Sequence, residues 1–173
     1  MKVLAIVQAR MGSERLQGKV IKPILNKPLI LYTLERLSKS KLIDEIVLAT
    51  STKDSEEPLV NIVKKQGYKV FRGDEDNVLE RYKKASDKYL GDIIIRVTGD
   101  CPLIDPVIVD NVVTYFKMYN YDYVRLDVPD SFIRGFDVEV FSKKALDKTY
   151  NIVNTAIEKE DKYDYKSYRE HVT

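Results

Sequence analysis

The sequence is poor in the residues and runs that build disulfides, metal clusters or membrane spans. One cysteine among 173 residues excludes an internal disulfide and any site made of several cysteines. This usage suits a reducing cytoplasm, where we expect the protein to work. No apolar run approaches the length of a membrane span, and the strand-like start lacks a cleavage site and is too short for a signal peptide. We therefore expect no membrane as a partner.

The chain also carries little net charge. The formal value is +2, so nothing in the overall charge calls for nucleic acid as a partner. Positive charge gathers instead in the segment 8–19, which follows the apolar run Val3–Val7 and contains Arg10, Arg15 and Lys19 with two glycines. Glycine lets the backbone approach a ligand, and arginine and lysine both bind phosphate. The loop therefore predicts a polyanion site, and a solvated basic loop is the plainer alternative.

Two familiar phosphate motifs are missing from this loop. A P-loop has four residues between its first glycine and its Gly-Lys-Ser/Thr, whereas five separate Gly12 from Gly18, and Val20 follows Lys19. No hydroxyl is therefore placed to hold magnesium as in a Walker-type ATPase. The Rossmann fingerprint Gly-x-Gly-x-x-Gly is also absent.

Short apolar runs alternate with helical patterns, which predicts an α/β fold with a mostly parallel sheet. The strongest runs are continuous, as expected for strands with helices on both faces. The expected strands are Val3–Val7, Glu45–Ala49, Lys69–Phe71, Ile93–Val97, Tyr123–Leu126 and Phe136–Phe141. The length and a hydrophobic content of 44% indicate one sizeable core.

Asp100 comes just after the expected strand Ile93–Val97, at the carboxyl edge of the predicted sheet. Ligands of open α/β sheets bind at that edge. Gly99 allows close approach, and a carboxylate that faces the loop 8–19 is well placed to hold Mg²⁺. The alternative is that Asp100 only caps a turn, which such Gly-Asp-x-Pro sequences often do.

Asp137 and Glu139 are two residues apart on an expected strand, so both side chains should point to one face. Two carboxylates on one face repel unless a cation lies between them. A second metal or a contact with sugar hydroxyls is therefore a candidate role, and an exposed strand face is the alternative. The one histidine, His171, is a candidate general base, but we favour an interface or solvated position. Cys101 is expected to be a packing residue.

These motifs together resemble one family. Its first-strand motif, Ala-x-x-Gly-Ser-x-Arg-Leu-Pro-Gly-Lys, is matched by Ala9, Gly12, Ser13, Arg15, Leu16, Gly18 and Lys19. The match continues at Lys27–Ile30, Arg72–Asp74, Val78–Tyr82, Arg96–Asp105, Gly135–Val140 and Arg169–Thr173. The family is the cytidylyltransferases that activate sugar acids. Within it the chain is most similar to the spore coat polysaccharide biosynthesis type, related to acylneuraminate and 3-deoxy-manno-octulosonate cytidylyltransferases.

The resemblance implies a Rossmann-like, three-layer nucleotidyltransferase (GT-A-like) fold with a mostly parallel central sheet. The implied activity is Mg²⁺-dependent transfer of CMP from CTP to an acidic sugar, with release of pyrophosphate, for a surface or spore coat polysaccharide. CTP and the acidic sugar are the implied partners, and a homodimer is a candidate assembly. We expect residues 1–157 to form the nucleotide-binding domain and residues 158–173 to be a polar tail, either truncated or part of an interface.

The expected site residues, from the residue chemistry and the resemblance together, fall into four groups. Arg15, Lys19 and Asp100 are expected to act in catalysis, the first two on the β- and γ-phosphates and the third on Mg²⁺. Asp137 is the expected second metal ligand. The nucleotide is expected to contact Ala9, Arg10, Gly12, Ser13, Arg72 and Thr98. The sugar is expected to contact Arg134, Asp137, Glu139 and Arg169, where an arginine fork would hold its carboxylate.

Two other functions stay open at this point. A glycosyltransferase of similar fold would bind a nucleotide diphosphate-sugar through an aspartate-bound metal, and a non-catalytic module would bind a nucleotide or sugar without reaction. The loop 8–19 favours a nucleotidyltransferase over a glycosyltransferase, because the first must hold three phosphates and the second only two.

Overall fold

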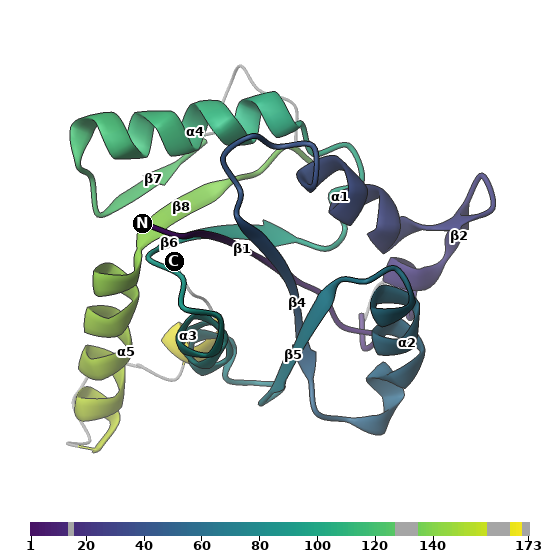
Figure 1. Cartoon of the computed structure of the whole chain (residues 1–173). Coiled ribbons are helices and arrows are strands. Elements are labelled where there is room, and N and C mark those ends of the chain that lie inside the picture. Colours follow the sequence, from purple (N-terminus) through teal and green to yellow (C-terminus); the bar gives the residue numbers. More distant parts are fainter. Residues whose placement is uncertain (14–15, 127–134, 159–166, 171–173) are drawn as a thin grey trace.

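The computed structural model describes residues 1–13, 16–126, 135–158 and 167–170. Its centre is a six-stranded sheet in the order β5-β4-β1-β6-β8-β7, with helices on both faces (Figure 1). The strands of this sheet are β1 (Val3–Gln8), β4 (Glu45–Ser51), β5 (Lys69–Gly73), β6 (Ile93–Thr98), β7 (Tyr123–Arg125) and β8 (Glu139–Ser142). The helices are α1 (Leu29–Leu37), α2 (Glu57–Lys65), α3 (Val78–Tyr89), α4 (Pro106–Tyr119), α5 (Lys143–Glu158) and α6 (Ser167–Glu170), with 3₁₀ turns η1 (Lys19–Ile21) and η2 (Asp54–Glu56).

The sheet is mostly parallel, as predicted. β1 pairs in parallel with β4 on one side and β6 on the other, and β5 continues the parallel set beyond β4. Within this six-stranded sheet, β8 runs antiparallel to its neighbours β6 and β7. The chain passes from β1 to β4 on one side and later returns to β6 on the other. The carboxyl ends of β1 and β6 therefore form the topological switch point, where open α/β sheets bind ligands.

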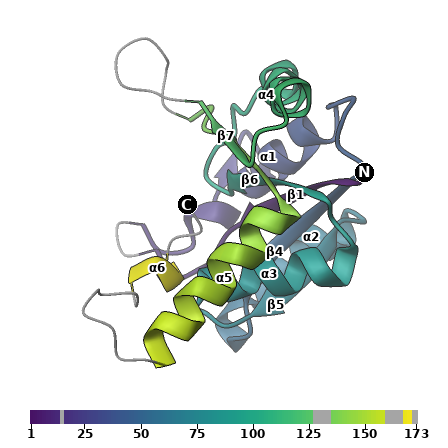
Figure 2. The ribbon, with the colours of Figure 1, turned by 90° about the vertical axis from the view of Figure 1, so that its left-hand side faces the viewer.

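Two apolar layers cover the sheet, because the buried side chains of β1 alternate between its faces. Val3, Ala5 and Val7 pack with buried residues of α1, α2 and α4, whereas Leu4 and Ile6 pack with residues of α3 and α5. Helices α3 and α5 lie side by side in both views (Figures 1 and 2). The predicted three-layer arrangement is thus confirmed.

A short hairpin follows the basic loop and was not predicted. Its strands are β2 (Pro23–Ile24) and β3 (Lys27–Pro28). Both residues of the connecting turn, Leu25 and Asn26, have positive φ angles of 47° and 65°. This is the backbone of a tight hairpin turn, which asparagine tolerates well.

The prediction for the last strand was wrong at its start. β8 begins at Glu139, not at Phe136, and the preceding residues bend at Gly135, whose φ is +102°. The Gly135 N–H donates to Oδ2 of Asp137 at 3.2 Å. Asp137 therefore belongs to a turn before the strand, and the argument that it shares a strand face with Glu139 fails.

The polar tail is described only in part. Helix α5 ends at Glu158, and α6 is the one described element within residues 158–173. Within the described ranges, no helix combines the length and apolarity needed to cross a membrane.

Candidate functional site

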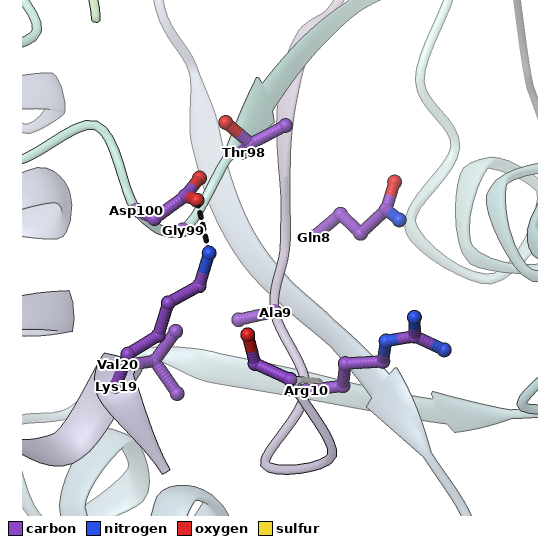
Figure 3. A pocket seen from close by; sticks show the side chains of 9 residues that line it. Gln8, Ala9, Arg10, Lys19, Val20, Thr98, Gly99 and Asp100 are labelled. Atoms are coloured by element: carbon purple, nitrogen blue, oxygen red, sulfur yellow. Dashed lines mark hydrogen bonds and ion pairs between the residues drawn. The ribbon is translucent and has the colours of Figure 1, made fainter. Parts of the chain in front are cut away.

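A cavity of about 320 Å³ lies at the carboxyl ends of β1 and β6, at the switch point of the sheet. Its lining comes from three places: the end of β1 and the loop after it, the start of η1, and the turn after β6. The lining residues are Gln8, Ala9, Arg10, Ser13, Lys19, Val20, Thr98, Gly99 and Asp100 (Figure 3). Six of the predicted site residues, Ala9, Arg10, Ser13, Lys19, Thr98 and Asp100, thus meet in one place.

Two described residues of the basic loop, Ser13 and Gly18, bond to the main chain of Met11. The Met11 carbonyl accepts hydrogen bonds from the N–H of Ser13 at 3.0 Å and of Gly18 at 2.9 Å. Gly18 has a φ of 66°, which glycine adopts without strain. Because η1 begins at the next residue, the hydrogen bond of Gly18 fixes the main-chain position of Lys19.

Lys19 and Asp100 form an ion pair across the cavity. Nζ of Lys19 donates to Oδ2 of Asp100 at 2.5 Å (Figure 3). Burial alone would raise the pKa of the Asp100 carboxyl, but hydrogen bonds from Lys19 and Thr98 and the positive charge of Lys19 hold that pKa below its ordinary value of 3.8. The cavity therefore presents an ionised carboxylate beside an ammonium group at neutral pH.

Gly99 allows β1 and β6 to approach closely beside this pair. Its N–H donates to the Gln8 carbonyl at 2.7 Å. A Cβ atom at this position would lie 2.7 Å from Cβ of Ala9 and 2.9 Å from Cδ1 of Ile30. These separations are far inside normal carbon–carbon contact, so only glycine fits between β1 and α1 at this position.

Glu56 is a site residue that the sequence analysis missed. It is 1% exposed, lies in η2, and is 45 residues from Met11 in sequence. Its Oε1 and Oε2 accept from the Met11 N–H at 3.1 and 3.0 Å, and Oε2 also accepts from the Thr50 hydroxyl at 2.7 Å. The buried carboxylate thus holds the residue to which Ser13 and Gly18 bond.

Gln8, which lines the cavity, was also missed. Its side chain points, like that of Arg10, to the side of the cavity away from the Lys19–Asp100 pair (Figure 3). Oε1 of Gln8 is buried and accepts no hydrogen bond from the part of the chain that the structure describes. Because a buried acceptor normally has a partner, this oxygen is available to a ligand.

Three of the predicted side chains have partners away from the cavity. Arg72 donates to the carbonyl oxygens of Ser51, Thr52 and Lys53 and pairs with Glu57, so it ties down the chain after β4. Glu139 pairs with Arg96 across the β6–β8 ladder. Arg169 donates from Nη2 to Oδ1 of Asn154 at 3.3 Å, which joins α6 to α5.

The remaining predicted residues are divided between loop, turn and undescribed segments. Gly12 lies in the basic loop, where a Cβ would be 3.8 Å from Oε1 of Glu75. Arg15, Arg134 and His171 lie outside the described residues. Cys101 is 4% exposed and packs in the core, as expected.

The Asp100 carboxylate at the cavity suits a hard divalent cation, whereas Asp137 is not among the lining residues. Burial raises the pKa of the neighbouring Cys101 thiol, and a hydrogen bond with Thr98 opposes this rise. Magnesium is commonly held by one or two carboxylates together with substrate phosphates and water, so Asp100 fits the ion. Among the described residues, no group of three or more His, Cys, Asp or Glu side chains is arranged to hold a metal.

Comparison with known proteins identifies the family. A family model described as cytidylyltransferase matches residues 4–170, nearly the whole chain. The chain belongs to the cytidylyltransferase family. The resemblance inferred from the sequence motifs is therefore confirmed.

Three curated relatives show how far the similarity extends. The chain is 39% identical over 173 residues to an uncharacterized protein of Methanocaldococcus jannaschii, covering 100% of this chain and 66% of that protein. It is 40% identical over 128 residues to the spore coat polysaccharide biosynthesis protein SpsF of Bacillus subtilis, covering 72% and 53%. It is 32% identical over 116 residues to the 3-deoxy-manno-octulosonate cytidylyltransferase of Geotalea daltonii, covering 66% and 44%. The chain thus spans 44–66% of the length of these relatives.

Solved structures agree with the fold. A cytidylyltransferase of Leptospira borgpetersenii superposes with a TM-score of 0.88 at 36% identity, covering 99% of this chain and 69% of that one. A CMP-2-keto-3-deoxy-manno-octonic acid synthetase complexed with CTP superposes with a TM-score of 0.72, covering 99% and 83%; at 19% identity this likeness concerns the fold alone.

Proposed function

We propose that the protein to which this chain belongs binds CTP in the cavity at the carboxyl ends of β1 and β6 and transfers CMP to an acidic sugar. The observation that carries the proposal is the Lys19–Asp100 pair, 2.5 Å apart, beside a basic loop at the switch point of the sheet. A triphosphate needs cations and its metal needs a carboxylate, and the cavity offers both side by side.

The reaction needs positioned charge more than a protein nucleophile. A hydroxyl oxygen of the sugar bonds to the α-phosphorus of CTP while the bond to the pyrophosphate oxygen breaks, and the hydroxyl proton leaves to solvent. Charge grows on the departing pyrophosphate, so fixed donors there lower the barrier. We assign Lys19 and Arg15 to the β- and γ-phosphates and Arg10 to the α-phosphate.

The cation site follows from the same pair. Asp100, with Asp137 and phosphate oxygens, would hold Mg²⁺, which when bound supplies Lewis-acid stabilisation of phosphate charge. Lys19 then has a second role: in the absence of nucleotide it neutralises Asp100, and when nucleotide enters it exchanges the carboxylate for a phosphate oxygen. This exchange keeps the carboxylate paired in both states.

The acceptor assignment rests on the relatives. The names of two of them concern a polysaccharide and a sugar-acid cytidylyltransferase, which supports an acidic sugar destined for a surface polysaccharide. Arg134 and Arg169 stay candidates for its carboxylate, and Asp137 and Glu139 for its hydroxyls. We also propose that the reaction takes place in the cytoplasm, in keeping with the single unpaired cysteine.

The test is pyrophosphate release from CTP in Mg²⁺ with 3-deoxy-manno-octulosonate and N-acetylneuraminate as acceptors. Lys19→Met should lower turnover by roughly 10²-fold, as expected for one lost transition-state donor. Lys22→Met is the matched control, because Lys22 is exposed just after the same 3₁₀ turn and should leave turnover unchanged.

The alternatives predict other results. Turnover of a nucleotide diphosphate-sugar in place of CTP would indicate a glycosyltransferase. Nucleotide binding without pyrophosphate release under any of these conditions would indicate a binding module. Equal turnover by the wild type and Lys19→Met would remove the basic loop from the mechanism.

A further inference from the structure

Glu56 is one of few polar side chains buried in the described part of the chain. It is 1% exposed, and its hydroxyl partner Thr50 is fully buried. An acidic group is buried only where strong hydrogen bonds compensate its lost hydration. All three hydrogen bonds that the structure gives this carboxylate come from two groups, the Met11 N–H and the Thr50 hydroxyl.

These contacts connect β4 to both ends of the basic loop. The Met11 N–H donates to the Glu56 carboxylate, and the Met11 carbonyl accepts hydrogen bonds from the N–H groups of Ser13 and Gly18. Gly18 leads directly into Lys19. A series of hydrogen bonds therefore runs from the sheet through Glu56 and Met11 to Gly18, which is bonded in the chain to Lys19.

The carboxylate also offsets positive charge beneath the loop. Arg81 is 3% exposed, and its Nη1 donates to the carbonyl oxygens of Asp74 and Glu75. Burial lowers the pKa of the Arg81 guanidinium and nearby Arg10 lowers it further, whereas Tyr82 and the carboxylates of Asp74 and Glu56 raise it. The charge of Glu56 thus offsets part of the effect that Arg10 has on the Arg81 guanidinium.

Helix α2 is held to the core by apolar side chains of its own. Leu59, Val60 and Val63 anchor α2 to the core, each at 1% exposure or less. Glu56 lies before the helix and directs its hydrogen bonds to the loop and β4 instead.

We infer that Glu56 is a positioning residue of the basic loop: it holds the main chain of Met11 and, through the hydrogen bond from Gly18 to Met11, places Lys19. The identity of the ligand rests on the proposed function. The effect of Glu56 on the main chain at Met11 and Gly18 rests on the hydrogen bonds alone. Preorganised donors bind more tightly because less order must be gained on binding.

The experiment compares Glu56→Ala, Glu56→Gln and Leu59→Ala, the last as a control that removes apolar contacts of α2 but no hydrogen bond to the loop. Binding of Mg·CTP and of inorganic tripolyphosphate is measured by calorimetry at a temperature where all variants are folded. Amide hydrogen exchange is followed at Met11 and Gly18. Glu56→Ala should weaken both ligands by roughly tenfold or more and speed exchange at both amides, since the loop loses its main anchor.

Glu56→Gln should restore slow exchange at both amides and most of the affinity, because its amide oxygen still accepts from Met11 and the Thr50 hydroxyl can turn to accept from the amide nitrogen. Leu59→Ala should lower the melting temperature and leave affinity and loop exchange unchanged. Wild-type affinity in Glu56→Ala, or an equal loss of affinity in Leu59→Ala, overturns the inference. If the wild type binds neither ligand, the proposed function fails, and the exchange data alone decide the role of Glu56.

Discussion

Replacing Gly99 by alanine should destabilise the protein because β1 and β6 leave no room for a methyl group. The added Cβ would lie 2.7 Å from Cβ of Ala9, 2.9 Å from Cδ1 of Ile30 and 3.2 Å from the Gln8 carbonyl oxygen. Carbon atoms normally meet at about 3.5–4.0 Å, and Ile30 is fully buried. Overpacking of this kind costs about 1–3 kcal/mol; since one of the obstacles is backbone, we expect a loss of about 3 kcal/mol in the free energy of unfolding.

The assay is equilibrium unfolding in urea, with two companion variants. Gly12→Ala is the control, because its Cβ would meet nothing closer than 3.8 Å and it should change the free energy of unfolding little. Ile30→Val removes the Cδ1 atom that the new methyl group would strike. In the double variant with Gly99→Ala, the total loss should therefore be smaller than the sum of the single losses. A Gly99→Ala protein as stable as Gly12→Ala would refute the close approach of the two strands.

Three further predictions concern charge and ligand contacts. Asp100→Asn should abolish CTP turnover, with no recovery in excess Mg²⁺ if the carboxylate is a direct ligand; an unchanged magnesium titration would return Asp100 to a turn-capping role. Burial alone would raise the pKa of the Glu45 carboxyl, but hydrogen bonds from Lys2 and Lys69 hold that pKa below its ordinary value of 4.5. The ionised Glu45 therefore stabilises the folded protein above that pH, and this stabilisation is lost as the pH falls through the folded-state pKa. In Glu45→Gln, the free energy of unfolding from urea titrations should fall less steeply between pH 6 and 3, taken as roughly the range of carboxyl titration. An unchanged pH dependence would assign the loss of stability to other carboxyls. Gln8→Met should weaken binding of CTP but not of tripolyphosphate, because its amide faces away from the Lys19–Asp100 pair; equal losses for the two ligands would show that Gln8 supports the loop instead.

Features that depend on neighbouring residues were predictable from the sequence. The basic loop was found because its cations and glycines are close in the chain and follow a buried strand. Asp100 was found because a parallel strand brings the residue after it to the ligand edge of the sheet. The parallel sheet itself follows from apolar runs that alternate with helical patterns. In each case local sequence and global fold point to the same answer.

Features that depend on distant pairing were not predictable. Glu56 lies in an acidic run in which nothing distinguishes it from Glu57, and only the fold brings it to Met11. The predicted role of Asp137 rested on strand periodicity, which does not apply because the chain bends at Gly135. Arg72 matches a family motif, yet in the described chain it binds three main-chain carbonyls, of Ser51 at the end of β4 and of Thr52 and Lys53 after it.

The position of the cavity between the two central strands couples ligand binding to the folding of the whole sheet. β1 and β6 are paired along their full lengths, and the cavity exists only while the residues that follow them stay in register. A ligand that contacts both segments therefore binds the native state and not the unfolded chain. At 100 times its dissociation constant, such a ligand raises the free energy of unfolding by about 2.7 kcal/mol. A thermal-shift screen of nucleotides and sugar acids thus reports occupancy of this cavity without any need for turnover.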